Sequence, residues 1–398
     1  MEKNFIIENN QLVKYMGKES VVVIPEGVKN IDYNVFCYNK YVNEIIIPDS
    51  IEFIDEKNFC ECPNLKFNVV DGIKYLGNKD NPYLVLVSSD EVSNCKVVDG
   101  CKIIMGKAFS DLETLASIMI PSSVKYIGFM AFYGCNNLKE LELNEGLIKI
   151  DDCVFELCNF NKIKLPNSLE YLGRDSFCIS GLTDVTLPNN LKYLGSCAFT
   201  ENEHKYNQYN NGYYFGSENN PYLCLVKVID KECTNFVMHQ DCKFVYSNAF
   251  LKLRNLKEVK LSDKVVQIGY SAFRECMSLE KVYIPETVEF FDEECFASCD
   301  KLKEITFPTS KITIDSGAFM GCNSLKEITL KNAIVGDNAF DGCSSLEKII
   351  IGDGCNLYGD YIFSDCPSLR EVILPEKLKN RYEEDEFEES ENVIIIYK

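Results

Sequence analysis

Hydrophobic and polar positions repeat along this chain with a period of about 23 residues. One unit, "LEKVYIPETVEFFDEECFASCDK" (279–301), places its apolar residues in the pattern L-x-x-V-x-I-P-x-x-V-x-x-F-x-x-x-C-F-x-x-C. Its first six residues alternate between apolar and polar, which is typical of a half-buried strand. Pro285 has no N–H to donate to a sheet, so it ends that strand and turns the chain. The pattern therefore predicts one short strand followed by a turn-rich segment in each unit.

The units can be counted from the phenylalanines that close an Ala-Phe-like pair. Neighbouring phenylalanines are 21–23 residues apart, except at two steps of 50 and 51 residues. A fixed period in this range indicates a solenoid, whose coils stack at about 4.8 Å. We therefore expect about 13 coils. The phenylalanines are Phe36, Phe59, Phe109, Phe132, Phe155, Phe177, Phe199, Phe250, Phe273, Phe296, Phe319, Phe340 and Phe363.

The two long steps contain related insertions. "YLGNKDNPYLVLV" (75–87) and "YFGSENNPYLCLV" (214–226) align without gaps at an offset of 139 residues. Each stretch reads as a strand, a polar turn with Asn-Pro, and a second strand, so we predict a protruding β-hairpin at each site. The insertions are placed at about 66–100 and 200–240.

Both ends of the chain depart from the repeat. Terminal coils of a solenoid expose their core unless something covers it, so we expect caps at residues 1–20 and 376–398 around a solenoid of residues 21–375. The first cap can form a hairpin, and the second is acidic and ends in a short apolar strand from Val393 to Tyr397.

The residue three positions after the phenylalanine is a cysteine in eight units. Leu112, Ser180, Asn202 and Leu253 fill the same position elsewhere, and a column of metal ligands or nucleophiles would not accept leucine. We therefore expect an inward packing position, where Cys acts as a small hydrophobe whose S–H can reach a loop carbonyl. The cysteines of this column are Cys62, Cys135, Cys158, Cys276, Cys299, Cys322, Cys343 and Cys366.

At this level of detail the unit "LASIMIPSSVKYIGFMAFYGC" (115–135) closely resembles the BspA-like class of leucine-rich repeat proteins. The resemblance covers nearly all of residues 20–375 and departs at the two insertions. It implies a β-rich, right-handed superhelix of leucine-rich repeats. It also implies a cell-surface adhesin or antigen, which would be displayed or secreted.

Charge narrows the choice of partner. The formal net charge is −20, the pI is about 4.7, and no block of basic residues occurs, so the surface should repel nucleic acid. The start of the chain lacks a signal-peptide core, and no segment approaches the roughly 18 apolar residues of a membrane span, so we expect no membrane insertion. We expect a monomer. The absent signal and the 20 cysteines favour a cytoplasmic location, against the surface location that the resemblance implies.

Little in the sequence indicates catalysis. The two histidines, His204 and His239, have no metal-ligand spacing to other residues, and no nucleotide-binding or C-x-x-C motif occurs, so we expect no catalytic residue, metal or cofactor. A remote alternative is a thiol-dependent enzyme that uses His239 with Cys233 or Cys242. However, three residues apart on an extended segment places His239 and Cys242 on opposite faces. Stacked side chains also give poor dihedral geometry for disulfides, so a disulfide framework is disfavoured.

The remaining hypothesis is a non-catalytic protein–protein interaction module, with an intracellular scaffold as the alternative to the adhesin. Two surfaces are candidates for the binding site. The first is the outward middle column of the strands, although strand propensity alone accounts for β-branched residues on a sheet. The second is the tyrosine-rich insertion, which resembles binding loops but could equally be a solvated segment. The candidate residues are Lys164, Lys260 and Tyr283 on the strands, and Tyr206, Tyr209, Tyr213 and Tyr214 in the insertion.

Overall fold

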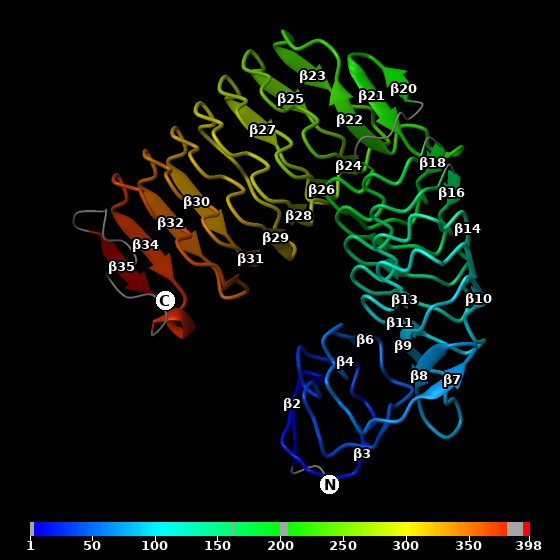
Figure 1. Ribbon diagram of the computed structural model, residues 1–398. Helices are drawn as coiled ribbons and strands as arrows, with labels where there is room; N and C mark the ends of the chain where they lie inside the picture. Colours follow the sequence, from blue (N-terminus) through cyan, green and yellow to red (C-terminus); the bar gives the residue numbers. More distant parts are fainter. Residues whose placement is uncertain (1–3, 161, 183, 200–205, 380–392) are drawn as a thin grey trace. The chain divides into compact units, whose positions relative to one another are not determined.

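The structure is a computed structural model that describes residues 4–160, 162–182, 184–199, 206–379 and 393–398. These residues form a β-solenoid of about 16 turns with a period of about 23 residues and almost no helix (Figure 1). The chain divides into two compact units, residues 1–205 (unit 1) and 206–398 (unit 2). The expected fold class is confirmed.

Most coils contribute one strand to each of two series of parallel strands, which we call ladders. Ladder A contains the L-x-x-I-x-I strands, and ladder B contains the strand that follows the proline turn. Ladder A is divided into separate sheets in both units, and ladder B is divided in unit 1. In unit 1, ladder A consists of β3 (Val21–Val23), β5 (Glu44–Ile46), β10 (Asn94–Lys96), β12 (Ser117–Met119), β14 (Glu140–Glu142), β16 (Lys162–Lys164) and β18 (Asp184–Thr186). Ladder B consists of β2 (Gln11–Tyr15), β4 (Asn30–Ile31), β6 (Phe53–Ile54), β9 (Val85–Ser89), β11 (Ile103–Ile104), β13 (Tyr126–Ile127), β15 (Lys149–Ile150), β17 (Tyr171–Leu172) and β19 (Tyr193–Leu194).

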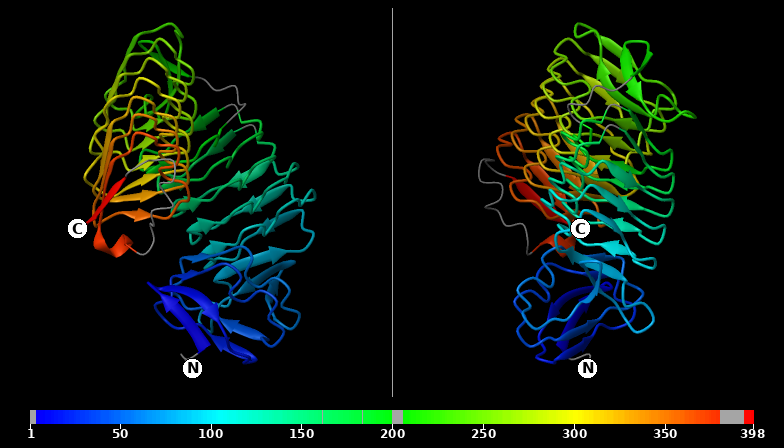
Figure 2. Two further views of the ribbon diagram at one scale, coloured as in Figure 1. Left: turned by 90° about the vertical axis from the view of Figure 1, so that its left-hand side faces the viewer. Right: turned by 45° about the vertical axis from the view of Figure 1, so that its right-hand side comes forward.

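Unit 2 repeats this arrangement, and Figures 1 and 2 show its two ladders on opposite sides of the stacked coils. Ladder A consists of β23 (Asn235–Val237), β25 (Glu258–Lys260), β27 (Lys281–Tyr283), β30 (Glu327–Leu330), β32 (Lys348–Ile351), β34 (Glu371–Leu374) and β35 (Ile394–Tyr397). Ladder B consists of β22 (Cys224–Val228), β24 (Phe244–Val245), β26 (Gln267–Ile268), β28 (Phe290–Phe291), β29 (Ile312–Ile314), β31 (Ala333–Val335) and β33 (Asn356–Leu357). A short 3-10 helix, η2 (Glu376–Leu378), precedes β35.

The repeated phenylalanines form a stack inside each unit. From Phe250 to Phe363, neighbouring rings lie 4.4–5.7 Å apart between centroids and are nearly parallel. From Phe109 to Phe199 in unit 1, the spacing is 4.9–5.7 Å. Buried aromatic rings remove large apolar areas from water, so this stack explains why the position recurs in each repeat.

All eight column cysteines point into the coils, where each Sγ donates to a backbone carbonyl at 2.9–3.4 Å. The acceptor is always the phenylalanine of the preceding coil, as in Cys299 Sγ to Phe273 O at 3.1 Å. Seven of these cysteines are buried, and Cys62 is half-buried. Most of these carbonyls also accept a backbone N–H, as Phe273 O does from Cys276 N at 3.1 Å, so the thiol supplies a second donor without enlarging the side chain.

The expected count of about 13 coils is too low, because it relied on the phenylalanine column. Ladder B contains three strands, β2, β9 and β22, whose coils carry no phenylalanine at this position. One of them belongs to the N-terminal hairpin and the other two belong to the insertions. Adding these three coils gives the observed number of about 16.

Each insertion is a three-stranded antiparallel meander. Meander 1 (residues 68–89) contains β7 (Asn68–Val70), β8 (Ile73–Leu76) and β9. Meander 2 (residues 207–228) contains β20 (Asn207–Tyr209), β21 (Gly212–Phe215) and β22. The predicted hairpins are present as β8 with β9 and β21 with β22. They do not simply protrude, because the last strand of each also pairs in parallel with the next strand of ladder B. This pairing occurs because the third strands are apolar: residues 84–86 and 223–225 are buried in the core of the solenoid.

Both chain ends extend the ladders. Strand β1 (Phe5–Glu8) pairs antiparallel with β2, and β35 pairs in parallel with β34. Residues 1–3 and 380–392 of the expected caps lie outside the described residues. The two cap boundaries therefore stay predictions.

One pair of cysteines forms a disulfide. Cys37 and Cys60 follow the phenylalanine in adjacent coils of unit 1, and their Cα atoms lie 5.0 Å apart, within the range for a disulfide. The expectation that stacked side chains disfavour disulfides is therefore wrong for this pair. The other 18 cysteines are free thiols.

Candidate functional site

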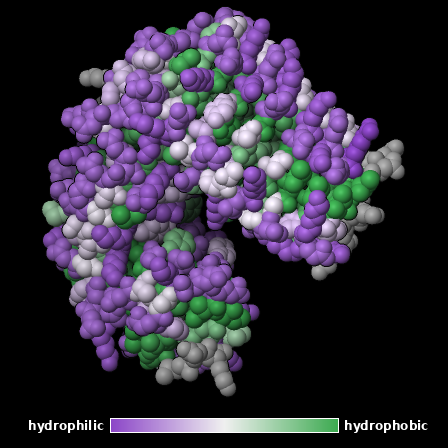
Figure 3. Space-filling model, turned by 180° about the vertical axis from the view of Figure 1, so that it is seen from behind, coloured by the Kyte–Doolittle hydropathy of each residue, from purple (hydrophilic) through white to green (hydrophobic). Residues whose placement is uncertain are grey.

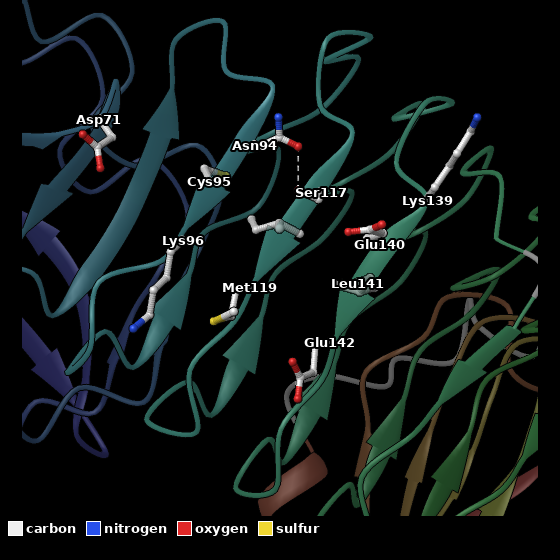
Figure 4. Close-up of a pocket in the computed structure, with 11 residues that line it drawn as sticks. Asp71, Asn94, Cys95, Lys96, Ser117, Met119, Lys139, Glu140, Leu141 and Glu142 are labelled. Carbon is white, nitrogen blue, oxygen red and sulfur yellow. Dashed lines mark hydrogen bonds between the residues drawn. The ribbon is translucent and has the colours of Figure 1, made fainter.

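The exposed side of β10, β12 and β14 carries a shallow depression of about 590 Å³ (Figure 4). We call it groove 1. Asp71, in the turn between β7 and β8, borders it from meander 1. This turn has positive φ at both Asp71 (50°) and Gly72 (81°), the geometry of a two-residue hairpin turn. Meander 1 therefore forms one wall of a groove whose floor is ladder A.

Two outward columns cross groove 1 in register. One column is Asn94, Ser117 and Glu140, in which the Ser117 hydroxyl donates to Asn94 Oδ1 at 2.7 Å. The other column is Lys96, Met119 and Glu142. Side chains on neighbouring strands lie about 4.8 Å apart, so each column is a continuous line of side chains.

The second column changes from positive to negative across the three strands. Lys96 lies on β10, Glu142 lies on β14, and Met119 lies between them with 48% of its surface exposed. Lys96 also forms an exposed ion pair with Asp99 at 3.3 Å, which leaves it accessible to other charges because such pairs are weak. Groove 1 thus offers a charged side chain at each end and a large apolar one in the middle.

The same face of unit 2 carries different side chains. The column in register there is Val237, Lys260 and Tyr283, on β23, β25 and β27. Val237 is 53% exposed and Tyr283 is 70% exposed. We call these three strands and their outward side chains face 2. Large exposed apolar residues on a regular sheet are typical of an interaction surface.

The structure places the strand candidates as follows. Lys164, Lys260 and Tyr283 are exposed on ladder A, with Lys164 opposite Thr186 of the next strand. Sequence reasoning missed Lys96 and Val237, because the insertions hid the strands that carry them. The signal was present: "VSNCKV" from 92 and "CTNFVM" from 233 match the strand pattern, with Val92 and Cys233 in place of leucine.

The tyrosine candidates separate into two groups. Tyr206 and Tyr209 are exposed, and the half-buried Tyr213 packs against Tyr206 with ring centroids 5.7 Å apart. Tyr214 is fully buried, and its hydroxyl accepts a hydrogen bond from the backbone N–H of His239 at 3.2 Å. Tyr214 therefore belongs to the core and cannot present its ring to a partner.

The residues behind the thiol-enzyme alternative do not form a nucleophilic site. His239 and Cys242 lie in one turn, which is closed by a hydrogen bond from Cys242 N–H to His239 O. The prediction that these residues lie on an extended segment is therefore wrong. Cys242 is buried, and burial raises the pKa of its thiol to about 12. Burial also raises the pKa of the Cys233 thiol. A nucleophilic cysteine requires a lowered pKa, so these thiols are unsuited to the role. His204 lies outside the described residues.

Neither a metal site nor a membrane-spanning helix occurs among the described residues. No group of three or more His, Cys, Asp or Glu side chains among them is arranged to hold a metal ion. Within the same ranges, no helix has the length and apolar character needed to cross a membrane.

Comparison with known proteins identifies the repeat. The family model for a BspA type leucine rich repeat region matches residues 7–79, 102–216, 230–335 and 314–397. No curated protein matches the chain significantly.

Several solved structures match at low identity. A leucine rich cell surface protein from Faecalibacterium prausnitzii is 25% identical, with 87% of this chain and 92% of that chain covered and a TM-score of 0.35. A leucine-rich repeat protein from Bacteroides ovatus is 21% identical, with 100% and 96% covered and a TM-score of 0.31. The pneumococcal vaccine antigen PcpA is 18% identical, with 100% and 97% covered and a TM-score of 0.37.

The family model spans far more than half of the chain and includes both units, and its repeat is the coil that the two ladders build. The chain belongs to the BspA-type leucine-rich repeat family.

Proposed function

We propose that this chain is a non-catalytic protein-binding module whose recognition surface is the exposed side of ladder A beside the meanders. The observation that carries the proposal is the pair of aligned columns with large exposed side chains, Met119 in groove 1 and Val237 and Tyr283 on face 2. A rigid sheet that presents side chains at fixed spacing can match a partner without an ordering cost. Hydrophobic patches also break an otherwise hydrophilic surface on the side of the molecule seen in Figure 3.

More specifically, we propose that the chain is displayed on the cell surface as an adhesin or antigen, as the family resemblance implies. The alternative is an intracellular scaffold, which the 18 free thiols favour because thiols persist best in a reducing compartment. Treatment of intact native cells with a protease separates the two forms. Loss of the chain from intact cells supports surface display, and protection until lysis supports the scaffold.

The binding surface can be tested with point substitutions. Deleting the tyrosine-rich segment is a poor test, because it would remove the buried Tyr214 together with the exposed Tyr206 and Tyr209. Tyr283→Ala is better, and Tyr361→Ala is its matched control because both tyrosines are 70% exposed and only Tyr283 lies on ladder A.

The experiment starts by isolating partners from the native cell and its surroundings and purifying the one that is enriched. Its affinity is then titrated against the intact chain and both variants. We expect Tyr283→Ala to weaken binding by about 30-fold, as for a residue that carries much of an interface, and Tyr361→Ala to change little. Equal affinity of all three proteins for the partner, with the same result for Met119→Glu, would remove ladder A as the binding surface.

A further inference from the structure

A second, smaller pocket of about 240 Å³ lies on the other side of meander 1, between β5 and β8. It is lined by the apolar side chains of Ile46, Phe67, Leu76 and Pro82. Small-molecule and cofactor sites usually have volumes of about 300–1,000 Å³, so this pocket is better matched to a single side chain. It lies beside the same ladder A face as groove 1, with meander 1 between the two.

The walls of the pocket are held by hydrogen bonds. Ile47 N–H donates to the carbonyl of Gly77 at 3.0 Å, and the Asn78 amide donates to the carbonyl of Ile47 at 3.0 Å. On the opposite side the Asn68 amide donates to the carbonyl of Pro82 at 2.9 Å. The pocket is therefore formed before a ligand arrives, and a partner does not have to order it.

The rim of the pocket is more basic than the rest of the chain. Lys66 and Lys79 are exposed there, with Glu44 as the single carboxylate of the lining. Across the described parts of the chain, no carboxylate lies within ion-pair distance of either lysine. The chain as a whole has a formal net charge of −20, so a local excess of positive charge is a departure from the surrounding surface. A partner segment that carries an apolar side chain next to a carboxylate would complement this site, because the apolar side chain matches the pocket and the carboxylate matches the two lysines.

We propose that this pocket anchors one aliphatic or aromatic side chain of a protein partner, in an extended segment where that side chain stands next to an aspartate or glutamate. The inference rests on the proposed function and specifies the partner's chemistry. The apolar side chain fills the space above Ile46 and Phe67, and the carboxylate lies toward Lys66 and Lys79. An anchor in a preformed pocket, surrounded by polar contacts, is the usual arrangement at the centre of a protein interface.

The test uses short random peptides displayed on phage as the probe and the full chain as the immobilised bait. Enriched peptides are synthesised, and their affinities are measured for the intact chain, for Lys66→Glu/Lys79→Glu, for Ile46→Lys and for Met119→Glu. Lys139→Glu, an exposed lysine in groove 1, is the matched control. Circular dichroism checks that each variant folds. If Ile46→Lys does not fold, the double lysine variant still decides the test, because it changes only exposed side chains.

The expected result is a family of peptides with an apolar residue beside Asp or Glu. Replacing that apolar residue by alanine, or reversing Lys66 and Lys79, weakens binding by about tenfold or more, and Lys139→Glu does not. Peptides that depend on Met119 and ignore Lys66 and Lys79 overturn the pocket and leave the proposed function standing. If no peptide is enriched and no native partner binds the intact chain, both proposals fail.

Discussion

Meander 1 and meander 2 have the same interior and different exteriors. In each, a fully buried tyrosine lies on the middle strand, Tyr75 in meander 1 and Tyr214 in meander 2. The Tyr75 hydroxyl accepts from Val98 N–H at 3.3 Å, and the Tyr214 hydroxyl accepts from His239 N–H at 3.2 Å. Each ring also packs edge-on against a second tyrosine, with centroids 5.6 and 5.7 Å apart.

Asparagines complete the shared frame. Asn81 and Asn220 each donate a side-chain N–H to a carbonyl of the following coil, at 2.8 and 3.0 Å. Asn68 and Asn207 each donate to the carbonyl of the turn proline, at 2.9 and 3.1 Å. The polar residues of these insertions, which resemble a solvated loop in the sequence, thus hold the turns in place.

The difference lies in the side chains around this frame. After β23, His239 stands where Val98 stands after β10, and it stacks on Tyr222 of meander 2 with centroids 4.1 Å apart. Tyr209 stands where meander 1 has Val70, and its ring meets the imidazole edge-on at 4.7 Å. The comparison teaches that the two copies share one scaffold that tolerates different surface chemistry, as expected if each copy contacts a different part of a partner.

The largest expected difference between the units comes from buried thiols at alkaline pH. Burial raises the thiol pKa of seven cysteines in unit 1 and of ten in unit 2, so the excess lies in unit 2. In unit 2, burial raises the pKa of Cys276, Cys322 and Cys366 from 9.0 to about 12. The unfolded thiols ionise near pH 9 and the folded ones do not, so folding stability falls as pH rises from 9 to 12. The loss is about 1.4 kcal/mol per pH unit for each protected thiol.

We therefore expect unit 2 to lose more stability than unit 1 between pH 8 and pH 10. Urea midpoints at both pH values, read by pulse proteolysis with the fragments assigned by mass spectrometry, measure this for each unit. The control is Cys322→Ala, which removes one titrating thiol and should reduce the pH dependence of unit 2 alone. Equal pH dependence of the two units would show that the buried thiols do not control it.

The shared frame predicts equal losses from equivalent substitutions. Tyr75→Ala and Tyr214→Ala each remove a fully buried ring, so each should lower the free energy of unfolding of its own unit by about 3–5 kcal/mol. Tyr→Phe at the same positions removes only the hydroxyl and should cost about 1 kcal/mol. Hydrogen exchange of the meander peptides measures both. A Tyr214→Ala loss near zero would mean that meander 2 is not built like meander 1.

The sequence predicted the repeated core well, because each coil buries the same positions and the pattern is therefore visible many times. Leucine, phenylalanine and cysteine columns were all readable from spacing alone. Tyr214 was misread because the segment that leads into it, "NQYNNG" (207–212), is polar, whereas the structure buries Tyr214 fully and leaves Tyr213 half-buried. A local pattern that occurs twice gives less information than one that occurs in most coils.

The binding surfaces were harder to predict for a physical reason. The small pocket joins Ile46 to Phe67 and Pro82, which are separated in the sequence and meet only because meander 1 folds back beside β5. The Cys37–Cys60 disulfide could not be predicted from spacing alone, because Cys276, Cys299 and Cys322 are also 23 residues apart in consecutive coils and remain free thiols.

The Cys37–Cys60 disulfide lies in unit 1, so its reduction should change the stability of unit 1 and leave that of unit 2 unchanged. It closes a span of 23 residues, and a cross-link over a loop of that length contributes about 3 kcal/mol in the chain-entropy account. Reducing agent, or Cys37→Ser/Cys60→Ser, should therefore lower the urea midpoint of unit 1. Unit 2, whose described cysteines are all free thiols, should not respond. A matching shift in unit 2, or no shift in unit 1, contradicts the assignment.

The smallest expected change in stability comes from a substitution that alters only the side chains in which the two meanders differ. His239→Val gives the turn after β23, which packs against meander 2, the residue found at the equivalent position beside meander 1, Val98. It removes the stacking on Tyr222 and the bond that His239 Nδ1 accepts from Asp241 N–H at 3.1 Å. We expect a loss of about 1–2 kcal/mol from unit 2 by hydrogen exchange.

The reverse change, Val98→His, should not stabilise unit 1. Meander 1 has Val70 where meander 2 has Tyr209, so an imidazole there lacks the edge-on ring contact. The two swaps should therefore be unequal, because Tyr222 has a counterpart in Tyr83 of meander 1 but Tyr209 has none. If Val98→His instead raises the stability of unit 1 by as much as His239→Val lowers that of unit 2, the imidazole acts independently of these neighbours, and the exteriors of the two meanders are interchangeable.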